Sequence, residues 1–347
     1  MEYIDIFDEN NNPIGEKKEK QQAHENGNFH RTAHIWIINE KNELLLQKRS
    51  ASKKSHPNCW DISGAGHIRA GENVIDGAIR ELKEELGVKA EEKDLQYITT
   101  IKSTKNPKNM EFQYVYLLKC NKKIEEYIFE DGEVSEVEYI FYRDLEKMVE
   151  EKVEGLLMHE EEYKYLFKYI MNRNIKIRKC TVDDVDSIYN IQNIVIDNFK
   201  KEEKGYFLPF KKETYLRIVN DPINDGEIYG AFLDDKMIAW IFLSVSNRMN
   251  ELKQMIPKLE GNCADIDGVI VLPEYRGYGL QKILVKHLEK MAREKEIENI
   301  IAEVTFGNVY SLRNLNDLGY EEQTWYQKDE NIKRYILLKK LGEVENE

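Results

Sequence analysis

The chain has 347 residues, of which 41% are hydrophobic and 33% are charged, and its formal net charge at pH 7 is −13. This length allows two domains of ordinary size, and no apolar run approaches the roughly 18 residues needed to cross a membrane. Excess acidic residues oppose non-specific binding to nucleic acid or anionic lipid, so we expect neither as a partner.

The first half of the chain alternates predicted strands with amphipathic helices. Strands are expected at residues 32–38 and 44–48, joined by a polar turn, and at residues 114–119. Helices are expected at residues 73–86, 144–151 and 160–171. The polar run at 172–174 breaks this pattern.

The second half begins with a predicted strand at residues 175–179, followed by a helix. Strands at 227–233 and 237–245 predict a hairpin about Asp234 and Asp235, and further strands are expected at 264–271 and 300–304. No long linker separates the halves, so we expect domains at residues 1–172 and 173–347, both of mixed α/β (α+β) class. Four widely spaced cysteines and a start without signal-peptide features favour a reducing cytoplasm.

Glutamates recur at helical spacing after a glycine in the first half. Gly66 is followed by Glu72 and then by Arg80-Glu81-Leu82-Lys83-Glu84-Glu85-Leu86-Gly87. In a helix, Glu81, Glu84 and Glu85 share one face. Clustered carboxylates suit Mg²⁺ or Mn²⁺, which also accept phosphate oxygens as ligands.

This segment resembles the signature of the Nudix hydrolases, which cleave a diphosphate linked to a variable group. The resemblance implies an α/β/α sandwich and a small-molecule diphosphate substrate. It makes Glu81, Glu84 and Glu85 the metal ligands, with Glu84, Glu81 and Arg80 as the catalytic set. Arg80 would orient a glutamate, and Glu72 would support the loop before the helix.

The first half is also similar to the isopentenyl-diphosphate isomerase-like branch of that family. The similarity is carried by Ala23-His24, His30-Arg31, residues 45–50, Lys53, Pro57, Trp60 and Gly66-His67. It implies a further metal site at His24, His30, His67 and Glu111, and diphosphate contacts from Arg49 and Lys53. The alternative is that these histidines and cations are ordinary surface or capping residues.

Two departures favour a hydrolase over an isomerase. The cysteine that the isomerases need falls on Ala65, and their partner glutamate falls on Gln113. Neither a methyl group nor an amide can act as acid or base in the proton transfers of isomerisation.

A glycine turn precedes a predicted helix in the second half. Arg276, Gly277 and Gly279 follow the strand at 264–271, and such a turn presents backbone N–H groups to phosphate. The turn, the order of elements and the ending Leu318-Gly319-Tyr320 resemble the GNAT N-acetyltransferases, which have a mixed sheet. Gln281 departs from the small last residue of their motif.

The resemblance implies binding of acetyl-CoA in a V-shaped opening, transfer to an amine acceptor, and contacts from Val269, Val271 and Asn308. The usual general-acid tyrosine falls on Leu315. Acid or base candidates are Tyr310, Asp265, Asp267 and Glu303. The leading hypothesis is a bifunctional diphosphohydrolase and N-acetyltransferase; the alternatives are a hydrolase with a CoA-sensing second half, and an isomerase.

Overall fold

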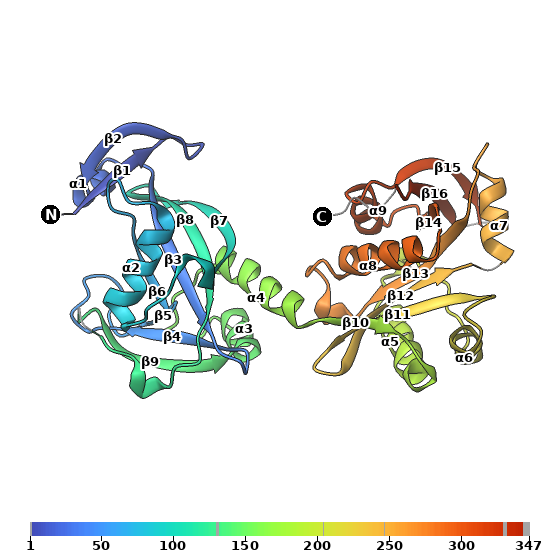
Figure 1. The fold of residues 1–347 in the computed structure, drawn as a ribbon, viewed down its shortest axis with the longest axis horizontal. Coiled ribbons are helices and arrows are strands. Elements are labelled where there is room, and N and C mark those ends of the chain that lie inside the picture. Colours follow the sequence, from blue (N-terminus) through green and yellow to red (C-terminus); the bar gives the residue numbers. More distant parts are fainter. Residues whose placement is uncertain (1, 130–131, 204, 246, 329–331, 343–347) are drawn as a thin grey trace. The chain divides into compact units, whose positions relative to one another are not determined.

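The structure, a computed structural model, describes residues 2–129, 132–203, 205–245, 247–328 and 332–342. It divides into two compact units, Met1–Ile170 and Met171–Glu347 (Figure 1). Within the described residues, no helix is both long and apolar enough to cross a membrane.

The first unit contains a mixed sheet in the order β5-β4-β3-β8-β7, with β6 paired to β3 and β9 paired to β4. Strands β3 and β8 are parallel, and the other pairs are antiparallel. A separate hairpin, β1–β2, starts the chain. The strands are β1 (Tyr3–Phe7), β2 (Pro13–Glu19), β3 (His30–Ile38), β4 (Glu43–Arg49), β5 (Trp60–Asp61), β6 (Gly64–His67), β7 (Leu95–Asn106), β8 (Asn109–Lys119) and β9 (Val134–Phe141). The helices are α1 (Lys20–Glu25), α2 (Val74–Leu86), α3 (Tyr142–Glu150) and α4 (Glu160–Asn174).

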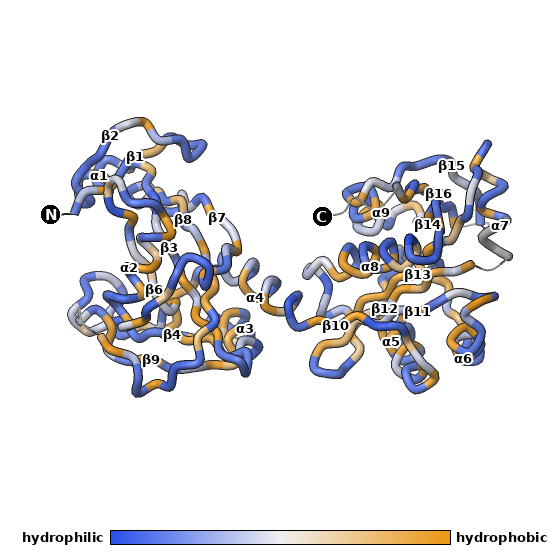
Figure 2. Tube along the Cα trace, in the orientation of Figure 1, coloured by the Kyte–Doolittle hydropathy of each residue, from blue (hydrophilic) through white to orange (hydrophobic). Residues whose placement is uncertain are grey.

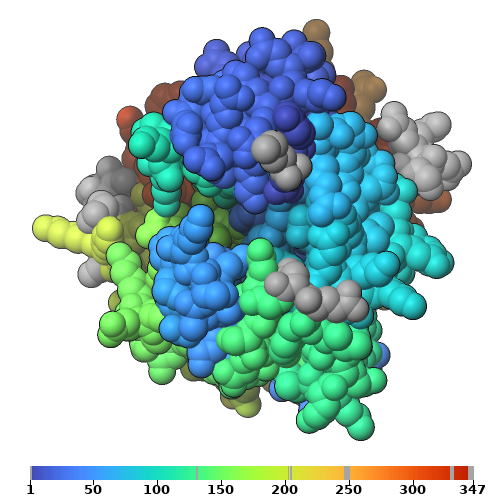
Figure 3. Space-filling model, turned by 90° about the vertical axis from the view of Figure 1, so that its left-hand side faces the viewer, coloured from blue at the N-terminus to red at the C-terminus, as the bar shows by residue number. Residues whose placement is uncertain are grey.

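Strand β3 divides an apolar face from a polar one. Ala33, Ile35 and Ile37 pack in one core with Ala78, Leu82 and Leu86 of α2. Because side chains alternate along a strand, His30, Thr32, His34 and Trp36 point to the opposite face. The N-terminal segment and α2 border a recess on the face of this unit shown in Figure 3.

The sequence-based end of α4 was wrong. The helix continues through Asn172, Arg173 and Asn174, which were expected to break it. Asparagine disfavours a helix by well under 1 kcal/mol per residue, too little to stop a helix that is already propagating.

The second unit is built on a seven-stranded sheet in the order β10-β11-β12-β13-β14-β16-β15. All neighbours are antiparallel except β13 and β14. The strands are β10 (Lys176–Lys179), β11 (Gly226–Leu233), β12 (Lys236–Ser244), β13 (Cys263–Val271), β14 (Asn299–Thr305), β15 (Glu321–Gln327) and β16 (Lys333–Lys340). The helices are α5 (Val185–Asp197), α6 (Lys212–Asn220), α7 (Asn247–Gln254), α8 (Leu280–Glu294) and α9 (Val309–Asn316).

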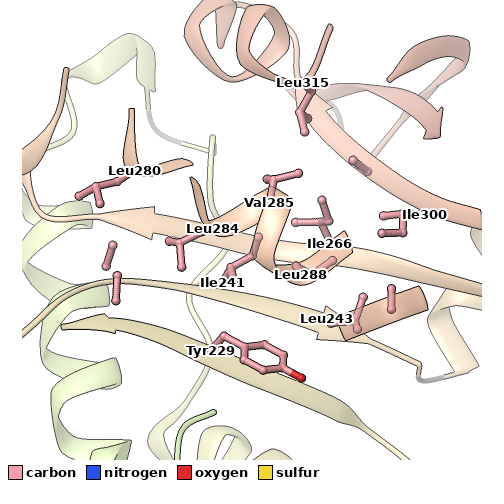
Figure 4. Close-up of a cluster of buried hydrophobic side chains, with 14 of the residues drawn as sticks. Tyr229, Ile241, Leu243, Ile266, Leu280, Leu284, Val285, Leu288, Ile300 and Leu315 are labelled. Atoms are coloured by element: carbon pink, nitrogen blue, oxygen red, sulfur yellow. The ribbon is translucent and has the colours of Figure 1, made fainter. Parts of the chain in front are cut away.

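Two apolar cores lie on either side of this second sheet. One joins the sheet to α8 through Leu284, Val285 and Leu288, which Figure 4 shows among their neighbours. The other joins it to α5 and α6 through Ile188 and Tyr215. In Figure 2 the central strands are accordingly mostly hydrophobic. The hairpin predicted about Asp234 and Asp235 is confirmed, with φ of 49° and 60° at these residues, values suited to a tight hairpin turn.

Candidate functional site

Helix α2 starts and stops where its sequence predicts. The Asn73 side chain accepts a hydrogen bond from the Asp76 N–H at 2.9 Å, which caps the first turn. Gly87 ends the helix with φ of 62°, a left-handed conformation that glycine adopts without strain. These caps fix the register in which the three glutamates leave the helix.

Arg80 is the hub of the glutamate cluster. Its Nη1 donates to Glu81 Oε1 at 2.6 Å and to Glu84 Oε2 at 3.1 Å. Its Nε and Nη2 donate to the two carboxylate oxygens of Glu72 at 2.9 and 3.0 Å, and Nη2 also donates to the His67 carbonyl at 2.9 Å. Glu72 therefore anchors the guanidinium, and the guanidinium orients Glu81 and Glu84.

The third glutamate lies deeper than the other two. Glu85 is buried, and its Oε2 accepts hydrogen bonds from Gln47 Nε2 at 3.3 Å and the Ala65 N–H at 3.2 Å. Glu84 remains 42% exposed and also accepts from Arg69 at 3.2 Å. The cluster thus reaches from solvent to the edge of β6.

The electrostatics of the cluster suit a cation. Burial, helped by the charge of Glu84, raises the pKa of Glu81, although Arg80 opposes the shift. Arg80 and Arg69 hold the pKa of Glu72 below its usual range against the effect of burial. A divalent cation would relieve the repulsion felt by Glu81, and the oxygen-rich ligand set is one that Mg²⁺ or Mn²⁺ accepts.

Gly66 lies directly against Glu81, so we expect Gly66→Ala to damage the site. A β-carbon at Gly66 would overlap the Glu81 side chain. We expect kcat for diphosphate hydrolysis to fall by roughly 10²-fold because the carboxylate is displaced. Urea unfolding should show a loss of about 1–3 kcal/mol.

Gly64→Ala is the matched control on the same strand. A β-carbon there would lie 3.4 Å from Glu85 Oε2, an ordinary contact, and both activity and stability should stay close to wild type. Equal activity losses in the two variants would contradict the role given to Gly66.

The structure brings together the three histidines singled out in the sequence. His24 Nε2 lies 3.1 Å from His67 Nε2, and the rings of His24, His30 and His67 have centroids 4.9–5.1 Å apart. Glu111 Oε1 lies 3.7 Å from the buried His30 Nε2, which has no hydrogen-bond partner. Ligand atoms of these histidines all lie within 4.8 Å of one another.

The surroundings of His24 and His67 favour the neutral imidazole, the form that can bind a metal. Burial lowers the pKa of His24, with a further contribution from His30, and lowers that of His67 well below its ordinary value. The adjacent imidazoles hold the pKa of Glu111 below its usual range although burial opposes its ionisation. Two or three neutral nitrogens beside one carboxylate fit a transition metal such as Mn²⁺ or Zn²⁺.

Neither cation expected to hold the diphosphate projects freely. Arg49 donates to Asp61 Oδ2 at 3.0 Å and to the Ser55 carbonyl at 3.0 and 3.2 Å. Lys53 pairs with Glu133. Either side chain has to exchange these partners before it binds a phosphate, so their diphosphate role stays a prediction.

A second polar cluster, which the sequence did not reveal, lies further along β3. His34 Nδ1 is 2.7 Å from Glu162 Oε2, and His159 Nε2 is 2.8 Å from Asp61 Oδ1. Burial disfavours the charged form of His34, but Glu162 more than offsets it and raises the pKa of His34 to about 9. Burial also opposes ionisation of Asp61, yet the hydrogen bond with His159 lowers its pKa to about 2. Residues more than 90 positions apart meet here, so no local pattern could have identified the cluster.

The glycine turn of the second unit has the backbone shape expected of a phosphate-binding loop. Gly277 and Gly279 have φ of 86° and 83°, and Gly279 is the N-cap of α8. A β-carbon on Gly277 would meet nothing within 4 Å, so the turn is open on that side. The N–H groups of the first turn of α8 point out of the helix and favour an anion.

Strands β13 and β14 separate next to this turn. Cys263–Ile266 of β13 pairs with Asn299–Ala302 of β14. Beyond this paired part, β13 continues through Val269 to Val271, and β14 continues to Thr305. This is where the sequence predicted a V-shaped opening. Asn308 begins α9, and its side chain accepts from the Ser311 N–H at 3.2 Å.

The acid and base candidates of the second unit occupy very different surroundings. Leu315 is buried in the core (Figure 4), whereas Tyr310 is 82% exposed. Glu303 accepts from Tyr326 Oη at 2.7 Å and from Arg334 at 2.8 Å, and Asp265 is 2% exposed. Asp267 is half-buried. The base roles of Asp265, Asp267 and Glu303 therefore stay predictions.

Comparison with known proteins agrees with this arrangement. Residues 28–158 match the NUDIX domain, and residues 191–320 match the acetyltransferase (GNAT) family. An uncharacterised Nudix hydrolase from Clostridium acetobutylicum is 36% identical over 184 residues, which cover 50% of this chain and 88% of that protein. Isopentenyl-diphosphate Delta-isomerase from Pectobacterium atrosepticum is 37% identical over 84 residues, covering 24% of this chain and 46% of that protein.

Among solved structures, the ribosomal-protein-S18-alanine N-acetyltransferase from Escherichia coli aligns with a TM-score of 0.37 and 18% identity. The alignment covers 50% of this chain and 97% of that one. The sequence matches and the two folds define a mixed α/β protein with a Nudix domain followed by a GNAT-type domain. The chain belongs to the Nudix family.

Proposed function

We propose that the chain is a bifunctional enzyme, with a divalent-metal-dependent diphosphohydrolase at residues 1–172 and an acetyl-CoA-dependent N-acetyltransferase at residues 173–347. The observation that carries the first activity is the contact of Arg80 with Glu72, Glu81 and Glu84 at 2.6–3.1 Å. The second rests on the glycine turn at the start of α8 beside the separating strands.

In the hydrolase, Glu81, Glu84 and Glu85 would hold Mg²⁺ or Mn²⁺, which supplies Lewis acidity to phosphate oxygens. The protein's own part is orientation. Arg80 fixes two carboxylates, Glu72 fixes Arg80, and Gly66 leaves room for Glu81 against β6. The substrate class is a small diphosphate joined to another group.

In the transferase, backbone N–H groups at Gly277, Gly279 and the start of α8 would bind the pyrophosphate of acetyl-CoA, with Arg276 beside them. Asn308 would contact the pantetheine, and an amine would accept the acetyl group. Positioning of the two reactants, with a proton relayed by water, can supply much of the catalysis in the absence of a tyrosine at position 315.

The experiment is to incubate the full chain with Mg²⁺ and a panel of diphosphates, with and without acetyl-CoA and amines. Release of phosphate-containing products and acetylated amine would support both activities. Hydrolysis with acetyl-CoA binding but no acetyl transfer would favour the second candidate, a hydrolase with a CoA-sensing domain. That candidate is motivated by the exposed Tyr310 and the buried Leu315.

We expect no isomerisation of isopentenyl diphosphate, despite the similarity to an isomerase. Ala65 has no thiol, and Gln113 has an amide in place of a carboxyl. That amide donates a hydrogen bond to Glu111 at 2.8 Å. Incubation in deuterated water, followed by mass spectrometry, should show no allylic exchange above the protein-free background. Exchange that depends on the protein would contradict the assignment.

A further inference from the structure

The cluster of His34, His159 and Glu162 has the composition and compactness of a metal site. One ligand atom from each residue lies within 4.8 Å of the other two. His34 is 6% exposed and Glu162 2% exposed. The His159 side chain is 24% exposed, so the cluster borders solvent at one point.

Outer partners already orient two of the three side chains. His159 Nε2 lies 2.8 Å from Asp61 Oδ1, and an ionised carboxylate can only accept, so Nε2 carries a proton. In the neutral imidazole, Nδ1 is then the nitrogen that can bind a metal. Arg49 and the Ile62 N–H in turn hold Asp61, at 3.0 and 2.8 Å. Histidines that bind metals usually donate their other ring N–H to a carboxylate or a carbonyl group, which fixes the orientation of the ring.

Glu162 has a comparable support. The Trp36 indole Nε1 donates to Glu162 Oε1 at 2.6 Å, and this leaves Oε2 facing His34. Trp36 is completely buried, so its hydrogen bond fixes the carboxylate from the protein interior. Beside His34, the pairing of β3 with β6 places Ala65, whose small side chain occupies little space next to the imidazole.

The distance between His34 and Glu162 suits a small cation after a modest adjustment. His34 Nδ1 and Glu162 Oε2 are 2.7 Å apart and share a hydrogen. Ligands bound tetrahedrally at about 2.0–2.1 Å lie roughly 3.3 Å from one another. The pair has to open by roughly half an ångström, and the cation then takes the place of the shared proton, which leaves to solvent.

We propose that His34, His159 and Glu162 form a binding site for a borderline divalent cation of the Zn²⁺ type. Two imidazoles and one carboxylate are a common zinc ligand set, and three protein ligands leave a fourth position for water or a substrate oxygen. The site is distinct from the glutamates of α2. It is also distinct from the His24, His30 and His67 cluster, because His30 and His34 are four residues apart on β3, roughly 13 Å along the strand.

The test uses full-length protein stripped with a chelator and titrated with Zn²⁺ in the presence of excess Mg²⁺. His67→Ala serves as the background, because it removes one imidazole of the other histidine cluster and so weakens that cluster as a competing site. We expect this variant to retain one tightly bound Zn²⁺ per chain by elemental analysis, and the double variant His67→Ala/His159→Ala to lose it. Glu162→Gln in the same background should also lose the tightly bound Zn²⁺.

Asp61→Asn provides a graded readout that loss of folding would not produce. Removing the support of His159 should weaken Zn²⁺ binding by about 10- to 100-fold without abolishing it. Thermal unfolding of each metal-free variant checks that it folds. No tight Zn²⁺ in the His67→Ala protein, or an affinity unchanged by His159→Ala, would overturn the proposal and leave two hydrogen-bonded pairs of structural importance only.

Discussion

Glu84→Gln is expected to lower kcat for diphosphate hydrolysis by about 10³-fold, in line with the loss of a charged group that stabilises a transition state. The amide keeps the size of the side chain and can still accept the hydrogen bond from Arg80 Nη1. It removes one negative charge from the predicted metal site. Because the Glu84 side chain is 42% exposed, the unfolding midpoint should barely change.

The measurement is steady-state hydrolysis of a diphosphate turned over by the wild-type chain, across a range of Mg²⁺ concentrations. Glu92→Gln is the control, since Glu92 is an exposed glutamate of the same unit outside the cluster. If Glu84→Gln turns over at the wild-type rate, the metal assignment of Glu84 is wrong.

Gly279→Glu is expected to abolish acetyl-CoA binding. Gly279 has φ of 83° at the N-cap of α8, so any larger side chain is strained there. Glutamate would in addition place a negative charge where the pyrophosphate is predicted to lie. Calorimetry with the full chain should show binding for wild type and no heat for the variant.

Gly279→Asn separates charge from backbone strain, because asparagine tolerates the left-handed conformation better than other residues. It should bind acetyl-CoA more weakly than wild type but measurably. Absence of both heat and a thermal shift for wild type at millimolar acetyl-CoA would remove the transferase assignment. Normal binding of acetyl-CoA by Gly279→Glu would mean that the pyrophosphate binds at another place.

The sequence predicted the parts of the molecule whose causes are local. Helix α2 was predicted with both of its ends because Asn73, the apolar spacing and Gly87 act over a few residues. The hairpin at Asp234 and Asp235 followed from its turn, and strand β14 from its apolar run.

Contacts between distant segments could not be predicted in this way. The partners of Arg49 and Lys53 lie in other strands and loops, and they turn two apparently free cations into paired ones. His34, Asp61 and His159 come from three separate segments, and contacts between distant parts of the chain, such as the bridge of Trp60 with Leu156, bring them together. The candidate metal ligands on α2 could therefore be predicted from the sequence, and the cluster of His34, His159 and Glu162 could not.

Gln281 was noted in the sequence only as a departure, yet the structure gives it a mechanical part. Its amide donates to Ser311 Oγ at 2.9 Å and accepts from Asn314 Nδ2 at 2.8 Å, so it joins α8 to α9. Ser311 also donates its N–H to Asn308. These hydrogen bonds link the start of α8, next to the glycine turn, with the start of α9, next to Asn308. Binding of a ligand that touches both the glycine turn and Asn308 would cost little conformational entropy of the protein. The affinity of that ligand would then depend on Gln281, a residue that the ligand need not contact.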